Sequence, residues 1–335
     1  MRSVSFAEPY RKVLGLDLPN SRDLRHLICG PYPPRSVAAG TGFVFLCSMK
    51  KLTLILLSLV VLVSCKDERV KPITPVVPVE PVNTPLESLP KDTGGQHQPV
   101  ISGSNDSPFG YYLYTPSGYT ATGPRFPLLV CLHGSGEVGD SQVNPSTLNL
   151  VLNVGPAFLI KAGKWNPKYP MIVASPQTSE EWWDPNKLAK FIEFLTATYQ
   201  ANPSRIYITG LSMGGSGVYD LISSDSMKFQ IAAAVPIVGG GILNERSAKK
   251  AVGIPLWAFH AKEDLIIPAD FDIAIVKAIN QLNPKVRAKL TMYPTLNHEV
   301  WAETYDGTGM GLEDPAYDPF NMEIYSWMLQ YSTSK

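Results

Sequence analysis

Short runs of consecutive apolar residues alternate with longer amphipathic stretches along most of the chain after residue 110. Runs rich in β-branched and aromatic residues predict strands that are buried on both faces. We expect such strands at 111–114, 127–132, 171–174, 205–209, 231–238, 255–259 and 288–292. The stretches between them predict helices at about 156–162, 186–199, 214–223, 269–281 and 320–330. The period of 3.6 residues is clearest in 186–199, where large apolar side chains form one stripe.

This alternation predicts an α/β fold, in which helices cover both faces of a mostly parallel sheet. We assign residues 99–335 to one such domain, because about 230 residues are ample for a single large core. Residues 65–98 before it form a linker in which proline recurs at every third position from 72 to 81. This spacing favours a semi-rigid polyproline II stalk, although a disordered linker would serve equally well as a spacer.

The segment 49–64 has the pattern of an export signal. Two lysines follow Met49, and an apolar run from Leu52 to Ser64 ends at Cys65. The run is too short to span a bilayer as a helix. The residues 62–65, Leu-Val-Ser-Cys, resemble a bacterial lipobox, which implies cleavage before Cys65 and a lipid on its sulfur. We therefore expect an exported protein that is anchored in the cell envelope, at the outer membrane or the cell surface.

An export signal belongs at the start of a chain, so residues 1–48 are a doubtful N-terminal extension. We hypothesise that Met49 is the true start. From Cys65 onwards the chain carries 21 Lys and Arg and 26 Asp and Glu, a net charge of −5. It has no basic run or patch, which argues against nucleic acid as a partner. Cys131 is then the one cysteine left in the folded domain, so we expect no disulfide there.

The sequence Gly-x-Ser-x-Gly at 210–214 directly follows the strand expected at 205–209. A strand, a tight turn with serine at its apex and a following helix expose the hydroxyl of a nucleophilic serine. We expect Gly210 and Gly214 to relieve crowding at this turn and to accept its backbone angles. Serine flanked by glycine is also common in ordinary loops, so the preceding strand is what favours Ser212 as a nucleophile.

A nucleophilic serine needs a base, and the base needs an orienting acid, in the chain order Ser, Asp or Glu, His. Two histidines follow Ser212, and His260 ends an apolar run and reads as part of a buried strand. By elimination His298 is the expected base. The acid should lie in the loop 261–268, where Glu263 and Asp264 are adjacent. We prefer Asp264, because the apolar residues after it should draw it inward, whereas the longer Glu263 should face solvent.

An oxyanion hole requires two backbone N–H groups. One is expected from Met213, the residue after the nucleophile. The other should come from the loop His-Gly-Ser-Gly-Glu at 133–137, which follows the strand 127–132, and we select the N–H of Ser135. We expect His133 itself to be structural.

Taken together, these motifs resemble the α/β-hydrolase superfamily. Within it the chain is similar to bacterial phospholipase/carboxylesterase-like proteins, also described as predicted peptidases, which are related to feruloyl esterases and polyhydroxybutyrate depolymerases. The matching segments lie between about 105 and 335, at 132–137, 175–177, 182–183, 210–214, 257–264, 268, 298 and 301. The resemblance implies a Ser212, Asp264, His298 triad, in agreement with the elimination above. Ala261 stands where such proteins usually carry glycine.

These inferences predict a serine esterase that hydrolyses carboxylic esters, with acetyl or feruloyl esters of polysaccharides as candidate substrates. Gln177, by the resemblance, and Trp183 and Trp301, by their aromatic character, are candidate substrate-binding residues, although for any one tryptophan packing is the slightly favoured role. We expect no cofactor, and no cluster has convincing metal-ligand spacing. Two alternatives stay open: a serine peptidase with the same triad, and a non-catalytic surface binding lipoprotein.

Overall fold

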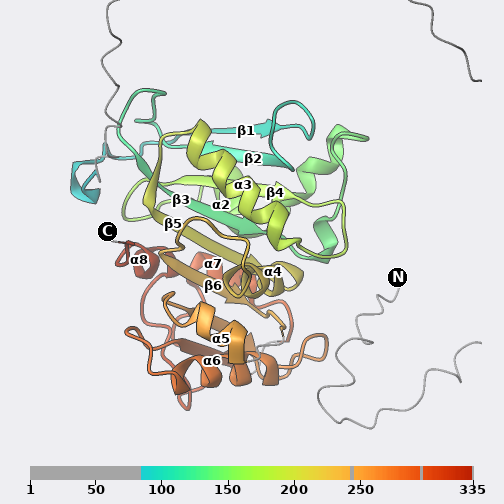
Figure 1. Cartoon of the computed structure of the whole chain (residues 1–335), viewed down its shortest axis with the longest axis vertical. Helices are drawn as coiled ribbons and strands as arrows, with labels where there is room; N and C mark the ends of the chain where they lie inside the picture. The colour runs from blue at the N-terminus through green and yellow to red at the C-terminus, as the bar shows by residue number, and fades with distance from the viewer. Residues whose placement is uncertain (1–83, 242–244, 295–296, 334–335) are drawn as a thin grey trace, which may run out of the picture. The chain divides into compact units, whose positions relative to one another are not determined.

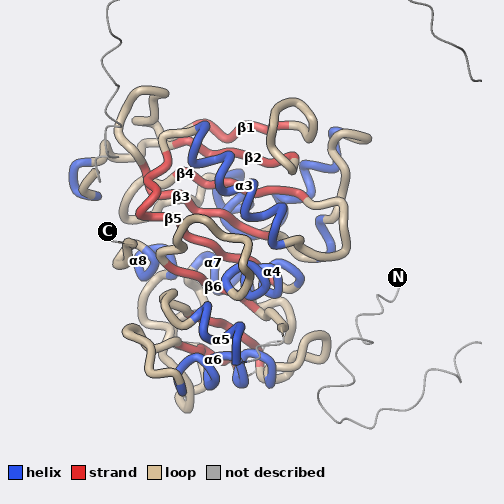
Figure 2. The backbone as a smooth tube through the Cα atoms, in the orientation of Figure 1, coloured by secondary structure: helices blue, strands red, loops and turns tan. Residues whose placement is uncertain are grey.

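The computed structural model describes residues 84–241, 245–294 and 297–333. Within these ranges eight strands form one sheet in the order β1-β2-β4-β3-β5-β6-β7-β8 (Figures 1 and 2). The strands are β1 Gln96–Val100, β2 Gly110–Thr115, β3 Phe126–Leu132, β4 Ile172–Gln177, β5 Ala201–Leu211, β6 Ala233–Ile237, β7 Trp257–Ala261 and β8 Lys289–Tyr293. Strand β2 is antiparallel to both β1 and β4, and the other pairs are parallel.

Helices cover both faces of this sheet, as the alternating pattern predicts (Figure 1). The α-helices are α2 Gly155–Lys161, α3 Pro185–Thr198, α4 Met213–Ile222, α5 Glu245–Ala251, α6 Asp270–Gln281, α7 Trp301–Asp306 and α8 Ile324–Met328. Short 3₁₀ segments are η2 Leu86–Ser88, η3 Ser135–Glu137 and η4 Pro145–Asn153. In the described ranges no helix combines the length and the apolar character that crossing a membrane requires.

Helix α3 shows how the sequence sets these elements. The Asp184 carboxylate accepts the N–H groups of Asn186 and Lys187 at the first turn, and Pro185 occupies the first helical position. The apolar stripe of this helix is buried against the sheet; it consists of Leu188, Ala189, Phe191, Ile192 and Leu195. The predicted stripe is therefore the face that fixes α3 on the domain.

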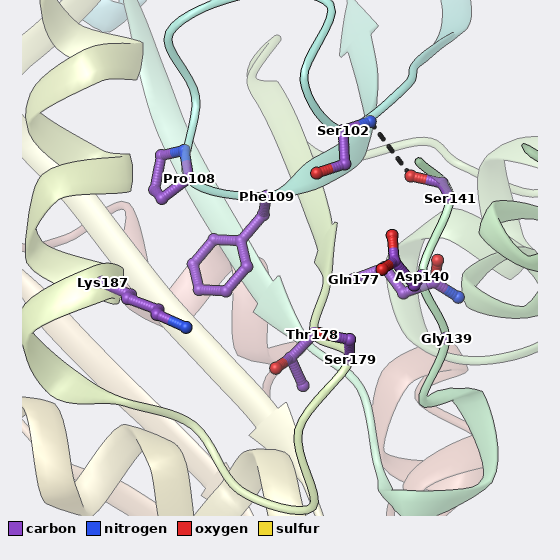
Figure 3. Close-up of a pocket in the computed structure, with 10 residues that line it drawn as sticks. All are labelled: Ser102, Pro108, Phe109, Gly139, Asp140, Ser141, Gln177, Thr178, Ser179 and Lys187. Carbon is purple, nitrogen blue, oxygen red and sulfur yellow. Dashed lines mark hydrogen bonds between the residues drawn. The ribbon is translucent and has the colours of Figure 1, made fainter. Parts of the chain in front are cut away.

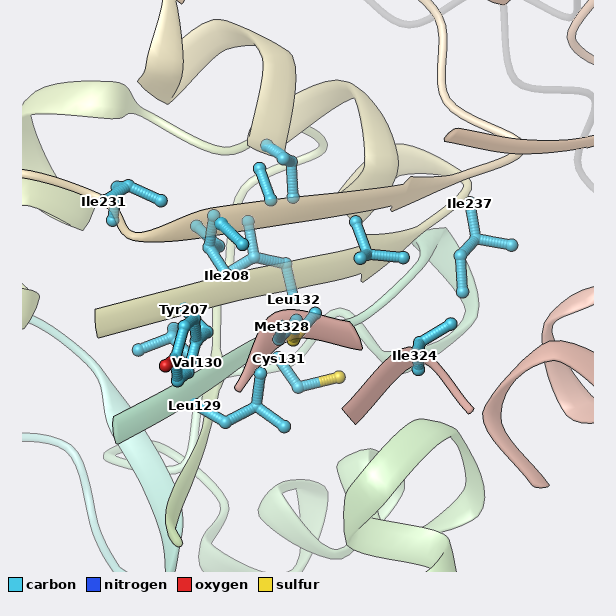
Figure 4. Packing of buried hydrophobic residues seen from close by; sticks show 14 of the residues in the cluster. Leu129, Val130, Cys131, Leu132, Tyr207, Ile208, Ile231, Ile237, Ile324 and Met328 are labelled. Atoms are coloured by element: carbon cyan, nitrogen blue, oxygen red, sulfur yellow. The ribbon is translucent and has the colours of Figure 1, made fainter. Parts of the chain in front are cut away.

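The central strands carry the core. Leu128, Leu129 and Val130 of β3 have no exposed surface, and the same holds for Tyr207 and Ile208 of β5. Figure 4 shows α8 on the face of the sheet toward which Cys131 and Leu129 point. A strand buried on both faces has to be apolar at consecutive positions, which explains the continuous runs in the sequence.

The folded part of the chain begins earlier than the expected residue 99. Leu86 and Leu89 are buried in the core cluster, and β1 begins at Gln96. The expected helix at 320–330 is shorter and covers Ile324–Met328. The export signal at 49–64, Cys65, residues 1–48 and the linker up to residue 83 lie outside the described residues.

Candidate active site

Ser212 lies at the sharp turn between β5 and α4. Its φ of 53° and ψ of −119° are angles that a residue with a side chain rarely adopts. A backbone in such a region costs about 1–3 kcal/mol and persists only where the surroundings hold it. Here the Ser212 N–H donates to the Ile237 carbonyl at the end of β6 at 2.9 Å, and the Ser212 carbonyl accepts the N–H of Ser216.

Gly210 and Gly214 are required by crowding, as expected, but not by unusual backbone angles. A Cβ on Gly210 would lie 2.4 Å from the Gly214 carbonyl oxygen, and one on Gly214 would lie 2.2 Å from the Leu132 carbonyl oxygen. Neither glycine has a positive φ; the strained residue of the turn is Ser212 itself. The two glycines let β3, β5 and α4 approach closely enough to hold that strain.

The three residues of the expected triad are joined by hydrogen bonds. Ser212 Oγ lies 2.8 Å from His298 Nε2, and His298 Nδ1 lies 2.7 Å from Asp264 Oδ2. Both Asp264 and His298 are buried. Because an ionised Asp264 has no proton to give, Nδ1 of His298 donates to it and Nε2 accepts from the serine hydroxyl. This is the arrangement in which an imidazole can take the proton of a nucleophile.

Asp264, rather than Glu263, is the acid that faces His298. Glu263 is exposed, as expected, but the reason expected for the inward position of Asp264 is wrong: Leu265 is 95% exposed and Ile266 is 70% exposed. Asp264 is held instead by hydrogen bonds, since its Oδ1 accepts the N–H groups of Ile266 and Ile267 at 2.8 and 2.9 Å.

The electrostatics of Asp264 favour its charged form. Burial opposes ionisation, but hydrogen bonds from His260, His298 and two backbone N–H groups outweigh it and hold the pKa of Asp264 well below its usual range. Asp264 is therefore a carboxylate at neutral pH. His260 lies on its other side, with Nε2 3.2 Å from Asp264 Oδ2.

The two backbone N–H groups expected in the oxyanion hole both lie at helix starts. Met213 is the first residue of α4, and Ser135 is the first residue of η3. N–H groups at these positions have no acceptor within their own helix and can serve an anion. A Cβ on Gly134 would lie 3.5 Å from Ser212 Cβ, so the start of η3 lies beside the nucleophile.

Glu137 fixes this loop, a role that the sequence analysis missed. Its Oε2 accepts the Gly134 N–H at 3.1 Å. Burial raises the pKa of the Glu137 carboxyl, while the hydrogen bond from Gly134 acts in the opposite direction. The signal in the sequence is the spacing of three residues between Gly134 and Glu137, which matches a capping box.

His133 is structural, as expected. Its Nδ1 lies 2.6 Å from the Gly134 carbonyl, and its Nε2 accepts the Thr178 N–H at 3.1 Å. Nδ1 therefore carries the proton. Burial lowers the pKa of His133 to about 4, so the ring is neutral at pH 7 and ties β3 to the loop after β4.

Two of the three expected substrate-binding residues have other roles. Gln177 is 4% exposed, and its amide N donates to the Glu137 and Thr147 carbonyls, so it ties the loop of η3 to η4. Gln177 also lines a polar pocket of about 40 Å³, which has room for a few water molecules (Figure 3). Trp183 is 1% exposed and donates its indole N–H to the His133 carbonyl, which leaves it no surface for a substrate.

Trp301 is the expected aromatic residue that does lie at the triad. Its ring meets the His298 ring edge to face, with centroids 5.6 Å apart. Trp301 is partly buried, and so retains some accessible surface beside the base. Among the described residues, no group of three or more His, Cys, Asp or Glu side chains is arranged to hold a metal ion.

An eight-stranded, mostly parallel sheet with helices on both faces, a strained serine turn and a buried His–Asp pair is the architecture of the α/β-hydrolase fold. Residues 176–331 match the model of the Dienelactone hydrolase family. Comparison with curated protein sequences gave no match.

Several solved structures resemble the chain. A thermostable esterase is 25% identical with a TM-score of 0.50, over 71% of this chain and 63% of its own. The present chain thus spans less than two thirds of that esterase. A feruloyl esterase module from Clostridium thermocellum, complexed with sinapinate, is 14% identical over 68% of this chain and 91% of its own, with a TM-score of 0.46. The acylaminoacyl peptidase of Pyrococcus horikoshii is 16% identical over 66% of this chain and 40% of its own, with a TM-score of 0.42.

Proposed function

We propose that this hydrolase is a serine carboxylic-ester hydrolase in which Ser212 is the nucleophile, His298 the general base and Asp264 the orienting acid. The observation that carries the proposal is the continuous hydrogen-bond chain from Ser212 Oγ through both nitrogens of His298 to Asp264 Oδ2. The strained serine turn at the end of β5 supports it, because such strain is typical of functional positions.

The reaction is acyl transfer to water. As Ser212 Oγ attacks the ester carbonyl, its proton passes to His298 Nε2, and the new imidazolium is stabilised by Asp264. His298 then protonates the leaving alcohol, which departs and leaves an acyl-enzyme on Ser212. Water attacks this ester with His298 again as the base, and the acid product and the free serine result.

The oxyanion formed in both steps is the charge that the site must stabilise. The N–H groups of Met213 and Ser135 are the proposed donors, supported by their positions at the starts of α4 and η3 beside Ser212. Preorganised donors of this kind contribute about 3–4 kcal/mol each to the barrier of acyl transfer. Glu137 supports them indirectly, because it holds the Gly134 N–H and with it the course of the loop.

Acetyl or aryl-acid esters of polysaccharides are the substrates we propose. Trp301 gives the triad an apolar border on the side of His298, and the exposed apolar residues Leu265 and Ile266 follow Asp264 in the chain. Such a border suits a small acyl or aromatic group next to the ester bond. A lipid on Cys65 would hold the enzyme at the cell envelope, where polymeric substrates are met.

The test is hydrolysis by the wild type and by Ser212→Ala of p-nitrophenyl esters of several chain lengths, acetyl-xylan and methyl ferulate. Loss of the nucleophile should lower kcat by about 10⁴-fold or more while the protein stays folded. The matched control is Ser223→Ala at the far end of α4, where the hydroxyl donates to the Tyr219 and Asp220 carbonyls of that helix.

Three results distinguish the alternatives. More than a few per cent of wild-type activity in Ser212→Ala excludes Ser212 as the nucleophile. Faster cleavage of peptide amides than of esters would identify a serine peptidase instead. No turnover of any ester or amide by the wild type would favour a binding protein.

A further inference from the structure

A second histidine lies directly behind the proposed triad. His260 of β7 has no exposed surface, and its Nδ1 lies 2.7 Å from Oδ2 of Asp272 on α6. Its Nε2 lies 2.8 Å from the Ile267 carbonyl oxygen and 3.2 Å from Asp264 Oδ2. In the described part of the chain, each ring nitrogen of His260 thus lies next to carboxylate or carbonyl oxygens alone.

These partners determine the protonation state of His260. A neutral imidazole has one nitrogen that must accept a hydrogen bond, and neither nitrogen here has an N–H or backbone donor beside it among the described residues. Burial alone lowers the pKa of His260, but the hydrogen bonds to Asp264 and Asp272 outweigh it and raise the pKa to about 10. The side chain is therefore an imidazolium between two carboxylates.

We propose that His260 is a positioning residue: a buried imidazolium that holds the Asp264 carboxylate against His298 and limits, by its positive charge, how tightly His298 binds a proton. The proposal rests on the proposed function, because His260 acts only through Asp264. It assigns a role to a histidine that chain order alone places merely in a buried strand.

The contacts of Asp264 support the role of His260 in holding this carboxylate against His298. Oδ1 accepts the two N–H groups of Ile266 and Ile267, and Oδ2 lies within hydrogen-bond distance of both His298 and His260. The carboxylate is thereby held at both of its oxygens. Without His260, Oδ2 keeps a single side-chain partner, and the alignment of His298 with Ser212 is less well fixed.

The charges around His260 support its effect on how tightly His298 binds a proton. Asp264 faces it from the loop after β7 and Asp272 from α6, while Tyr219 of α4 donates to the other oxygen of Asp272. Burial and the charge of Asp272 raise the pKa of Tyr219 well above 10, so it stays neutral. The neighbouring position on β8 is Met292, which cannot ionise. The Asp264, His260 and Asp272 group therefore carries one net negative charge.

Replacing His260 by a neutral residue would expose His298 to two uncompensated carboxylates. His298 would then bind a proton more tightly and stop acting as a base at a higher pH. We expect His260→Gln to move the acid limb of the pH profile of kcat/KM upward by about one pH unit or more. The kcat at the optimum should fall about 10- to 100-fold, the effect of one lost charge-assisted hydrogen bond, with little change in KM.

The double variant His260→Gln, Asp272→Asn restores one net negative charge without restoring the histidine. Its acid limb should return toward the wild-type pH while kcat stays low. A purely structural role would not produce this return. Tyr219→Phe is the control, because it perturbs the same buried network without changing a charge. The double variant also has one uncompensated buried charge fewer than His260→Gln. It can therefore be measured even if His260→Gln fails to fold.

Imidazole ¹⁵N NMR of the wild type measures the protonation state of His260 without any assay of activity. We expect both nitrogens of His260 to stay protonated from pH 5 to 9. A non-protonated nitrogen on His260 at pH 7 would overturn the proposal, and so would an unchanged acid limb and kcat in folded His260→Gln. If instead the wild type neither hydrolyses esters nor reacts with a fluorophosphonate, the proposed function itself fails, whatever the NMR result for His260.

Discussion

At the scale of single residues, chain order and spacing identify which side chains meet but not which interactions hold them in place. Elimination among five histidines selects His298, and the structure places it between Ser212 and Asp264. The expectation for Gln177 did not foresee that backbone carbonyls already use its amide N–H groups, since a motif does not reveal which atoms have partners.

The network behind the triad was missed because its members come from three separate elements. One signal was present in the sequence: Asp272 occupies a position of the buried stripe of α6, beside Ile275, Val276 and Ile279. An acidic residue on an apolar helix face needs a buried partner, since an unpaired buried charge is costly. The position of Asp272 therefore indicates a buried partner, and in the structure this partner is His260.

Gly214→Ala tests the crowding at the serine turn. The added Cβ would lie 2.2 Å from a backbone oxygen of β3, which cannot move without displacing the strand. We expect a loss of about 3 kcal/mol or more in the free energy of unfolding, measured by urea denaturation. Gly253→Ala is the control, because a Cβ there meets nothing within 4 Å, and its effect should stay below about 1 kcal/mol. Equal effects of the two substitutions would contradict the packing argument.

At the scale of elements, buried strands were predictable and edge or polar elements were not. The seven expected strands are all present, because strands covered on both faces are apolar without interruption. Strand β1 was missed, since the edge strand Gln96–Val100 is polar and half exposed and is ordered by its pairing with β2. The 3₁₀ segment η4 and the helices α5 and α7 were missed for a related reason. They are short, and tertiary contacts rather than a periodic pattern determine them.

At the scale of the whole molecule, the chain combines the described domain with an N-terminal segment that lies outside the described residues. The fold of residues 84–333 is that of a hydrolase, whereas the lipid anchor on Cys65 rests on the sequence pattern alone. We propose that the enzyme is held at the cell envelope by a proline-rich spacer.

Cys65→Ser tests this organisation in bacteria that process lipoproteins. We expect the wild type in the membrane fraction and the variant in the soluble exported fraction, because the acyl chains provide the membrane affinity. The intact mass of the purified wild type should correspond to a chain that begins at a lipidated Cys65. A mature protein that retains residues 1–48 would contradict the proposed start at Met49 and the cleavage before Cys65, and one without lipid would contradict the anchor.

The central claim is that Ser212 forms a covalent acyl-enzyme with the help of His298. Its most direct test is intact mass spectrometry after reaction with a fluorophosphonate, followed by peptide mapping. We predict one adduct per chain on Ser212, none in Ser212→Ala, and an adduct formed far more slowly in His298→Ala. An adduct on another residue, or ester hydrolysis without any adduct on Ser212, would contradict the account.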